Sequence, residues 1–521
     1  MMADLQEPWL GENPLSKPYA PSPATLRWVR CREFPEFLID QVAKDGQRVD
    51  LGKFSSALRA AELFDNRSID LPGAVIALPS GQRLLGHFCR LVRQHYEAAG
   101  LVEYDYPYLA PLSSIATFSQ VFPADHRVLF VGTRIDFNQG QPLGVLVPTG
   151  EPIIYPHWQK IIKNHRDLPI EMYRHTRFFR PWSRGKSGRG IFNALEGADM
   201  FEFHGCYEKG RASEAGRRLF RMLVGLAEAI AVPILWSTRP PWSNYAEVSH
   251  ATVGGDSPLP SGATLQVGTL YDQGDIFSRP YGISYVDANG RSQNPHHIVG
   301  ALSRRLLLAH LLYGMLTNGS FLPHPEISPY QVNIVVRRTE RDGADSGTAL
   351  ASALSARGLR IRISVADSSH DVARALKHSA RLLVPLTIIL QGRRHDGDVA
   401  RFVLRRSDDL SEAYHQGSDF SALSSDVVLD ALSDLKHAYE ARIHRYLMSR
   451  CTEVRTIEDA RAALQARKVV LCPLEFGHGA GDEIARWQQG EILGYVEASE
   501  PRPCIVSGRV CSTSAFVSPR A

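Results

Sequence analysis

The order in which apolar segments follow one another changes near residue 330, and this change constrains the fold more than any other feature. Before it, short β-rich runs such as VLFVG, MFEFHGCY and ATLQVGTLYD are interrupted by a few long amphipathic helices. After it, strand and helix patterns alternate regularly from about Tyr330 to Ser411. The first pattern predicts an α+β unit with a largely antiparallel sheet, and the second predicts a separate small α/β unit with a mostly parallel sheet.

Shorter segments divide the chain further. The first fifty or so residues are rich in proline and broken in pattern, which predicts a loosely packed extension. The run HIVGALSRRLLLAHLLYGML predicts a strongly apolar helix, and DVVLDALSDLKHAYEARIHRYLMSR predicts a helix that leads to a last segment with three cysteines. We therefore expect an extension at 1–50, a core at 51–328, an α/β unit at 329–430 and a C-terminal unit at 431–521.

Composition excludes several classes of protein. With 44% hydrophobic and 22% charged residues, the 521-residue chain is neither disordered nor fibrous. The formal charge of +4 is too near balance to indicate a nucleic-acid partner by itself. Seven scattered cysteines favour a reducing compartment, which we take to be the cytoplasm. No secretory signal is recognisable and no run approaches the roughly 20 apolar residues of a membrane span, so we expect a soluble protein.

Four motifs stand in a characteristic order. They are LVPTGEP at 146–152, RDLPIEMYRHTRFFRPW at 166–182, SGATLQVG at 261–268 and GALSRRLLLAHLLYG at 300–314. In this order and at these separations they resemble the catalytic core of class II aminoacyl-tRNA synthetases, most closely prolyl-tRNA synthetases of the archaeal and eukaryotic type. The resemblance extends from about Leu51 to the end, because VPLTIILQGRRHDGDVARFVLRRSD is similar to the family's anticodon-binding domain and KVVLCPLEF with RPCIVSGRVCSTSAFVSPRA is similar to its zinc-binding domain.

The resemblance implies two catalytic arginines. Arg180 falls on the arginine of the second motif, which would bridge the α-phosphate of ATP and the amino-acid carboxylate. Arg304 opens the helix of the third motif and would hold the γ-phosphate and lie over the adenine. A planar guanidinium suits both tasks, although an isolated arginine is more often a surface ion-pair partner.

Further residues match the family's substrate contacts. Thr149 and Glu151 would form a polar corner for the α-ammonium group, or alternatively only cap a helix start, and both can hold. Gln266 falls on an ATP-facing glutamine, although a strand glutamine often only bonds across strands. In the loop SRGKSGRG, Arg189 would contact a triphosphate, unless this loop is only a solvated connection.

The departures from the family pattern are also informative. Trp182 stands where the family has the glutamate that reads adenine, so adenine must be read differently or not at all. Tyr271 and Asp272 replace a histidine-bearing segment of the proline pocket, which predicts a substrate other than proline. The family's Gln-Glu-Gly-His strand has become ADMFEFH or LEGAD. In the C-terminal unit only Cys472, Cys504 and Cys511 remain, with Ser507 in place of a fourth cysteine, so we expect no bound zinc.

Three functions fit these observations. The first is an enzyme of the prolyl-tRNA synthetase type that uses ATP and Mg²⁺ to make an aminoacyl-adenylate and passes the acyl group to tRNA. The second is a paralogue that passes it to a small amine, thiol or carrier protein. The third is a silent binding or regulatory protein that keeps the fold. The family's cores pair, which implies a homodimer. Four arginines on the α/β unit can face RNA or form a solvated strand edge: Arg393, Arg394, Arg405 and Arg406.

Overall fold

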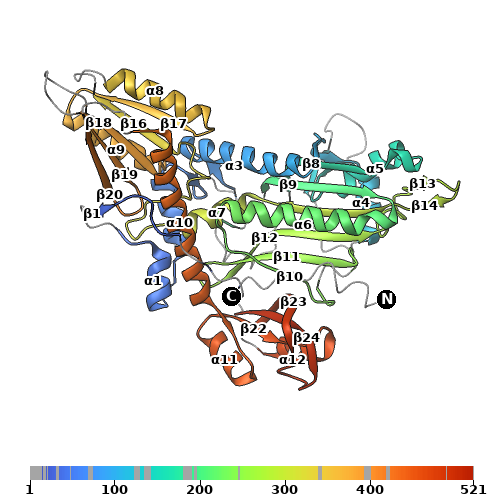
Figure 1. Cartoon of the computed structure of the whole chain (residues 1–521). Helices are drawn as coiled ribbons and strands as arrows, with labels where there is room; N and C mark the ends of the chain where they lie inside the picture. The colour runs from blue at the N-terminus through green and yellow to red at the C-terminus, as the bar shows by residue number, and fades with distance from the viewer. Residues whose placement is uncertain are drawn as a thin grey trace.

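The structure is a computed structural model, and Figure 1 shows its arrangement. It describes residues 15, 19, 22–30, 35–46, 48–68, 74–121, 129–133, 142–179, 191–192, 196–243, 247–337, 343–391, 400–417, 423–487 and 490–519.

One large sheet forms the centre of the molecule. Its eleven strands have the order β21-β22-β24-β23-β10-β11-β12-β15-β9-β8-β4, and only the pairs β4–β8 and β21–β22 are parallel. This confirms the α+β class with a largely antiparallel sheet. The strands are β4 (Val102–Glu103), β8 (Ile170–Phe179), β9 (Glu196–Tyr207), β10 (Leu235–Thr238), β11 (Ala251–Pro258), β12 (Thr264–Gly274), β15 (His296–Leu302), β21 (Cys451–Glu453), β22 (Val469–Pro473), β23 (Gly490–Pro503) and β24 (Val510–Pro519).

The C-terminal segment is built onto the core sheet. It contributes the last four strands, and β23 meets β10 through the pair Thr238 and Tyr495. Two short helices, α11 (Ile457–Gln465) and α12 (His478–Arg486), pack beside these strands. The sheet therefore continues across the predicted boundary between the core and the C-terminal unit.

Helices cover the two faces of the sheet differently. On one side lie α3 (Pro79–Ala98), α6 (Ala212–Ala229) and α7 (Arg304–Tyr313), which share one hydrophobic core with the sheet. On the other side lie α4 (Leu112–Val121) and α5 (Glu151–Ile161), which pack in a second core. We call these sides the α3 face and the α5 face. Because successive strand residues point to opposite faces, neighbours in one strand belong to different clusters.

A second sheet forms the α/β unit. Its order is β1-β20-β19-β18-β16-β17, and only the two pairs made by β16 are parallel. The expectation of a mostly parallel sheet is therefore wrong, because the short segment 407–410 joins β19 to β20 and such a connection permits only an antiparallel pair. The elements are β1 (Val29–Arg30), β16 (Val332–Arg337), α8 (Gly343–Ala356), β17 (Ile361–Ala366), α9 (Ser369–Arg381), β18 (Leu386–Gln391), β19 (Ala400–Arg406) and β20 (Ser411–Gly417).

The described part of the N-terminal extension is not loosely packed. Its strand β1 adds to the edge of β20. The carboxylate of Asp434, on the long helix α10 (Ser425–Arg450), accepts hydrogen bonds from the backbone N–H groups of Thr25 and Leu26 and from the indole of Trp28. A short polar segment can dock in this way when a buried carboxylate offers its lone pairs to several donors.

Two further expectations need correction. The segment expected as one apolar helix divides into β15 and α7, with Ser303 as the N-cap of α7. Helix α6, which crosses the α3 face, was not anticipated. The remaining elements are α1 (Leu38–Asp45), α2 (Leu51–Ala60), β2 (Phe64–Asp65), β3 (Ile76–Ala77), β5 (Leu109–Ala110), β6 (Leu129–Thr133), β7 (Pro142–Leu146), β13 (Tyr285–Val286), β14 (Ser292–Gln293) and the 3-10 turns at His165–Asp167 and Lys209–Arg211. Within the described ranges, no helix is both long and apolar enough to cross a membrane.

Candidate active site

The N-terminus of α5 forms a polar corner against the α5 face of the sheet. Gly150 is the N-cap and Glu151 is the first helical residue, where a carboxylate is favoured by the helix dipole. The Thr149 hydroxyl donates to Glu151 Oε2 at 2.5 Å, and Gln273 Nε2 donates to Glu151 Oε1 at 3.0 Å. Tyr155 in turn donates to Gln273 Oε1 at 2.5 Å. The structure thus brings Thr149 and Glu151 together, as the motif predicts.

Strand β9 places two more polar residues under this corner. The backbone N–H of Gly150 donates to Glu202 Oε1 at 3.3 Å, and His204 Nε2 lies 3.0 Å from Glu202 Oε2. The antiparallel register sets Glu202 opposite Arg174 of β8. Of the two segments that matched the family's Gln-Glu-Gly-His strand, the structure therefore selects ADMFEFH, whose Glu202 and His204 lie beside the Thr149–Glu151 corner.

Burial affects the ionisation of the side chains around the Thr149–Glu151 corner. Glu151, Glu202 and His204 are buried, and so is Gln273. Burial, together with the nearby charge of Glu151, raises the pKa of Tyr155 well above its ordinary value, so its hydroxyl is a donor at neutral pH. The Glu151 carboxylate is held by the neutral donors Thr149 and Gln273, which leaves its negative charge for an ammonium group.

Strand β12 separates the predicted pocket residues. Tyr271 pairs with Val299, whose other neighbour is His204, so Tyr271 lies in the row of the α5 face. Asp272 is its successor in the strand and faces the other side, where burial raises the pKa of its carboxyl and the Gly274 N–H donates to it at 3.1 Å. Gln273, two residues after Tyr271, returns to the α5 face and bonds Glu151 in the corner. Gln266 pairs with Asp256 further along β12.

Arg304 points to the α3 face. Its Nε donates to Asp199 Oδ2 at 2.7 Å, and its terminal nitrogen pairs with the same oxygen. The guanidinium lies 5.6 Å from the ring centroid of Phe64. Asp199 has a φ of 49°, a left-handed conformation that aspartate tolerates better than most residues. Arg304 is therefore buried in an ion pair, separated by the sheet from Glu151.

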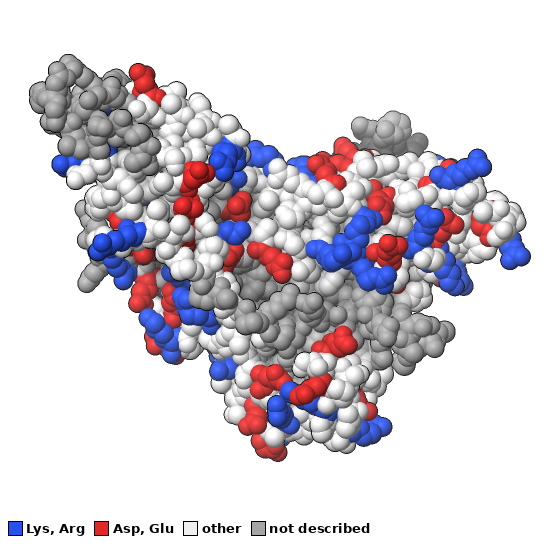
Figure 2. All heavy atoms as spheres, viewed as in Figure 1, with Lys and Arg blue, Asp and Glu red and all other residues white. Residues whose placement is uncertain are grey.

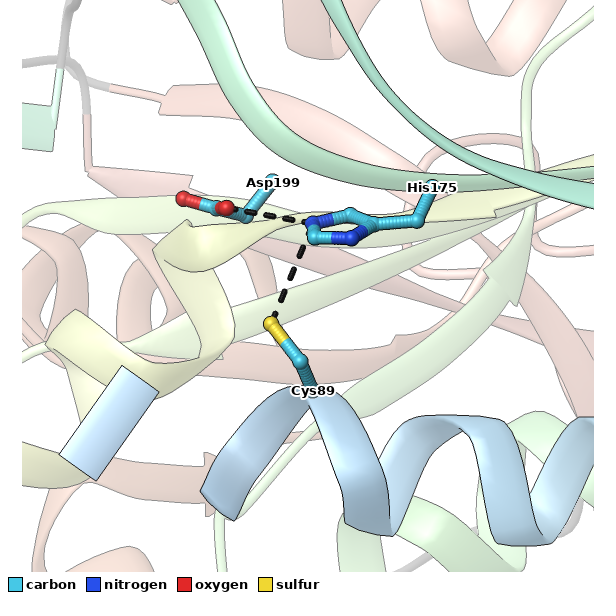
Figure 3. A group of neighbouring side chains, drawn as sticks. All are labelled: Cys89, His175 and Asp199. Atoms are coloured by element: carbon cyan, nitrogen blue, oxygen red, sulfur yellow. Dashed lines mark hydrogen bonds and ion pairs between the residues drawn. The ribbon is translucent and has the colours of Figure 1, made fainter. Parts of the chain in front are cut away.

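Figure 3 shows the group around Asp199. His175 Nε2 lies 3.1 Å from Asp199 Oδ1 and 3.8 Å from the Cys89 sulfur. Arg93 Nη2 lies 3.2 Å from His175 Nδ1. Because a guanidinium only donates, Nδ1 is the acceptor, and the neutral ring carries its proton on Nε2 and donates it to Asp199. Burial on its own would raise the pKa of Asp199, but the His175 hydrogen bond and the Arg304 charge outweigh it, and the pKa is lowered.

This group offers the donor atoms of a metal site. Among the described residues, only Cys89, His175 and Asp199 bring three such atoms within 4.8 Å of one another. However, a metal-binding histidine normally donates its second ring N–H to an acceptor, and here that nitrogen faces the donor Arg93. Burial, with the charge of Asp199, raises the pKa of the Cys89 thiol to about 12, which opposes the thiolate that a metal needs. We therefore assign this group a structural role in holding Arg304.

Several predicted site residues lie outside the described residues. They are Arg180, Trp182 and Arg189, together with the rest of the loop SRGKSGRG, and Arg393 and Arg394 in the α/β unit. The expected convergence of Arg180 and Arg304 over one nucleotide therefore stays a prediction.

The C-terminal cysteines make separate contacts. Cys472 and Cys511 each donate to backbone carbonyls, at 3.8 Å to Ala515 and at 3.4 Å to Thr513. The Cys504 sulfur accepts the backbone N–H groups of Glu475 and Ser507, both at 3.5 Å. The Ser507 hydroxyl donates to the Glu475 carboxylate at 2.7 Å, so it is engaged inside the protein.

Two of the arginines considered for RNA binding are engaged within the protein. Arg406 is buried, donates to Asp408 at 2.8 and 2.6 Å, and lies 5.1 Å from the Trp28 ring centroid. Arg405 lies 3.7 Å from Glu412 on the neighbouring strand. Over the face shown in Figure 2, basic and acidic side chains are interspersed. Neither arginine presents a free charge to a phosphate backbone.

Sequence reasoning missed several residues of these clusters. Gln273 and Tyr155 were missed because the packing of β12 against α5 decides which side chains face the corner. The position of Arg174 could have been predicted from the sequence. It lies two residues after Met172, a core residue of β8, and therefore points to the same buried face. His175 and Asp199 are distant in the sequence and meet only through the β8–β9 pairing.

Comparisons with known proteins agree with this geometry. No protein-family model matches the chain. The proline--tRNA ligase of Pyrobaculum neutrophilum is 25% identical over 456 residues, covering 86% of this chain and 90% of the relative. That of Thermococcus kodakarensis is 25% identical over 469 residues, covering 88% of this chain and 94% of the relative.

Two solved structures share the fold. Giardia lamblia prolyl-tRNA synthetase in complex with prolyl-adenylate superposes with a TM-score of 0.76 at 18% identity, covering 94% of this chain and all of that one. The Cryptosporidium parvum enzyme complexed with halofuginone and AMPPNP gives 0.76 at 17% identity, covering 90% and 94%. The antiparallel sheet thus has the fold of a class II aminoacyl-tRNA synthetase core. Over most of its length, the chain is similar to enzymes of the prolyl-tRNA synthetase type.

Proposed function

We propose that this chain is an ATP-dependent ligase that activates an amino acid as its adenylate and transfers the acyl group to an acceptor. The observation that carries the proposal is the Thr149–Glu151 corner, stacked on Glu202 at the N-terminus of α5. It offers buried carboxylate oxygens to an ammonium group, on a chain that matches proline--tRNA ligases over most of its length. A solved relative binds prolyl-adenylate, the product of such an activation.

The chemistry divides into two steps. A carboxylate oxygen of the amino acid attacks the α-phosphorus of ATP, the bond from that phosphorus to the pyrophosphate oxygen breaks, and pyrophosphate leaves. A hydroxyl or amine of the acceptor then attacks the acyl carbon, AMP leaves, and the nucleophile's proton is released. Thr149 and Glu151 orient the amino acid by its ammonium group, so that one carboxylate oxygen is aimed at the phosphorus.

The nucleotide side of the proposal depends on the matched arginines. Arg180, Arg189, Gln266 and Trp182 are proposed to contact ATP, and Arg304 to hold its γ-phosphate. To do so, Arg304 has to leave the Asp199 carboxylate on the α3 face and reach the nucleotide beside the amino acid bound at Glu151, because its Nε donates to Asp199. Phosphate and carboxylate are competing acceptors for one guanidinium fork.

Mg²⁺ would enter with ATP. The carboxylate paired in register with Gln266 is that of Asp256, and Arg239 donates to both of its oxygens, at 2.6 and 3.1 Å. This carboxylate is therefore a poor metal ligand, and we propose that Mg²⁺ is held chiefly by the phosphates of ATP and by water, as is usual for this ion. The ion would neutralise phosphate charge.

The acceptor and assembly are proposed from the family. Relatives named as proline--tRNA ligases favour tRNA as acceptor, and class II cores of this type favour a homodimer. The internal pairing of Arg405 and Arg406 favours the alternative of a small amine, thiol or carrier protein. We expect the enzyme to act in the cytoplasm, where its free cysteines stay reduced.

The test is ATP–pyrophosphate exchange with the purified full chain and a panel of amino acids, including proline. We expect exchange that depends on at least one amino acid. If a folded preparation gives no exchange with any of them, the chain is the silent paralogue. Aminoacylation of bulk tRNA with the active amino acid then separates tRNA from a small acceptor.

A further inference from the structure

Arg174 is a buried cation that has no hydrogen-bond partner among the residues that the structure describes. Its residue is 1% exposed, and neither Nε nor the two terminal nitrogens has an acceptor within hydrogen-bond geometry. Its contacts are an ion pair from Nε to Glu202 Oε2 at 3.7 Å and the ring of Phe178, whose centroid lies 5.2 Å from the guanidinium carbon. A guanidinium carries five N–H donors, so most of its hydrogen-bonding capacity is unused.

This residue belongs to the pocket rather than to a distant part of the core. A methyl group added to Gly150 would lie 2.1 Å from Glu202 Oε2 and 2.7 Å from His204 Nε2. Glu202 Oε2 is the same oxygen that faces Arg174. The base of the Thr149–Glu151 corner is therefore the Arg174–Glu202–His204 group, with only the bare Cα of Gly150 between.

His204 is a second buried side chain whose polar atoms lack hydrogen bonds to the described residues. It is fully buried and neither of its ring nitrogens makes a hydrogen bond, although Nε2 lies 3.0 Å from Glu202. Buried polar groups are normally paired, and unpaired ones call for an explanation such as a missing ligand. Here two donor-bearing side chains lie beside the corner proposed to receive the ammonium group. Glu202 Oε2 faces both side chains but lies outside hydrogen-bond geometry for each, so a bound molecule with an oxygen at this point would supply an acceptor that they lack among the described residues.

The charged side chains around Arg174 indicate whether the oxygen of the bound molecule is charged. Arg174 is balanced by Glu202, which leaves Glu151 for the ammonium group of the substrate. The substrate's own carboxylate is assigned to Arg180. No described cation in the cluster is left for a second carboxylate, whose uncompensated burial would be costly. The oxygen should therefore be uncharged, as in a hydroxyl or a carboxamide.

We propose that Arg174, with His204, selects an amino acid whose side chain carries an uncharged oxygen acceptor. This rests on the proposed function and deepens it. Because Arg174 is 1% exposed, an oxygen that it binds is enclosed by the protein. An enclosed donor discriminates strongly, because the analogue without the oxygen leaves it unpaired.

The test compares near-isosteric substrates in ATP–pyrophosphate exchange. The pairs are trans- and cis-4-hydroxy-L-proline against L-proline, L-threonine against L-valine, and L-asparagine against L-leucine, with L-aspartate as the charged counterpart of L-asparagine. For the pair that the pocket accepts by size, we expect kcat/KM for the oxygen-bearing member to be at least about tenfold higher. L-Aspartate should react more slowly than L-asparagine.

Two variants separate selection from positioning. Arg174→Lys keeps the charge beside Glu202 but loses the forked donors, so the preference should fall to within about threefold of unity while exchange with the apolar member persists. Arg174→Met should lose the preference too. Arg406→Lys is the matched control, since Arg406 is also buried beside an aromatic ring and a carboxylate in the other sheet, and it should leave the preference unchanged.

The outcomes are distinct. If the wild type prefers the apolar member of every pair, or if Arg174→Lys keeps the full preference, the inference is overturned while the proposed function stands. If no amino acid supports exchange, the proposed function itself fails.

Discussion

The two faces of the central sheet carry polar clusters built from neighbouring residues, yet the clusters differ in completeness. Arg174 and His175 are adjacent in β8 and point to opposite faces. On the α5 face, Arg174 and His204 make no hydrogen bond to any described residue. On the α3 face, His175, Asp199 and Arg304 all have partners, and Arg93 completes the group. The first cluster is incomplete without a ligand, whereas the second is complete in the folded protein.

This difference between the two clusters indicates that the amino-acid site is already assembled in the folded protein, whereas the proposed nucleotide site is not. The amino-acid half has its ammonium corner assembled, with Glu151 held by Thr149 and Gln273. In the nucleotide half, the arginine matched to the γ-phosphate is engaged by Asp199. Substitutions on the α5 face should therefore act on the amino acid, and those on the α3 face on stability and on ATP.

The largest effect is expected for Glu151→Gln. The amide keeps the shape but removes the charge that faces the ammonium group, so kcat/KM for the amino acid in exchange should fall by about 100-fold, the equivalent of roughly 3 kcal/mol for a charged partner. Glu171→Gln is a suitable control, because Glu171 bonds Tyr207 and Arg218 away from the corner. Equal activity of wild type and Glu151→Gln would contradict the corner's assignment.

Gly150→Ala should also act through the α5 face. The new methyl group would lie 2.1 Å from Glu202 Oε2, so Glu202 and His204 must move, and the unfolding free energy should fall by about 1–3 kcal/mol with loss of exchange. Gly86→Ala in α3 meets nothing within 4 Å and should instead stabilise the helix by about 0.5–1 kcal/mol. Chemical denaturation of both variants measures these changes in unfolding free energy. If Gly150→Ala keeps wild-type stability and exchange, the contacts of Gly150 with Glu202 and His204 are not tight.

Asp199→Asn should affect the α3 face. Breaking the buried pair with Arg304 should lower the unfolding free energy by about 3 kcal/mol, and the freed guanidinium should lower KM for ATP severalfold. Asp408→Asn is the control, because it removes a carboxylate partner of Arg406 in the other sheet. The side chains of Arg406 and Asp408 are 7% and 11% exposed, close to the 8% and 9% of Arg304 and Asp199, and this variant should change stability alone. An unchanged KM for ATP in Asp199→Asn would remove Arg304 from the nucleotide site.

The smallest effect concerns pH. The pKa of Asp199 is lowered in the folded protein, against the effect of burial, by the His175 hydrogen bond and the charge of Arg304. A lowered pKa contributes stability above the ordinary aspartate pKa, and this contribution is lost as pH falls through the folded value. The stability difference between wild type and Asp199→Asn should thus be full near pH 6 and shrink below about pH 4. Urea titrations at several pH values measure it.

The sequence predicted those parts of the architecture that follow from apolar alternation within a segment or from the order of the motifs along the chain. Alternating apolar residues located the strands β8, β9 and β12, and the order of motifs identified the class and the Thr149–Glu151 corner. The parallel character of the second sheet was predicted wrongly, because hairpin strands and helix-linked strands have the same residue pattern.

The site itself was only partly predictable. Tyr271 and Asp272 were expected to share a pocket, but strand alternation points them to opposite faces and places Gln273, not Asp272, on the face of the corner. The pairing of Arg304 with Asp199 depends on a left-handed residue 105 positions earlier, which no local pattern reveals. Such contacts are set by strand register, which follows from packing of the whole sheet.

The most direct test of the account is the KM for the amino acid in ATP–pyrophosphate exchange at saturating ATP, measured for wild type, Glu202→Gln and Asp199→Asn. We predict that KM rises at least about tenfold in Glu202→Gln, which weakens the α5-face cluster, and stays within about twofold in Asp199→Asn. If Asp199→Asn raises this KM as much as Glu202→Gln does, the two faces do not have separate roles and the account is wrong.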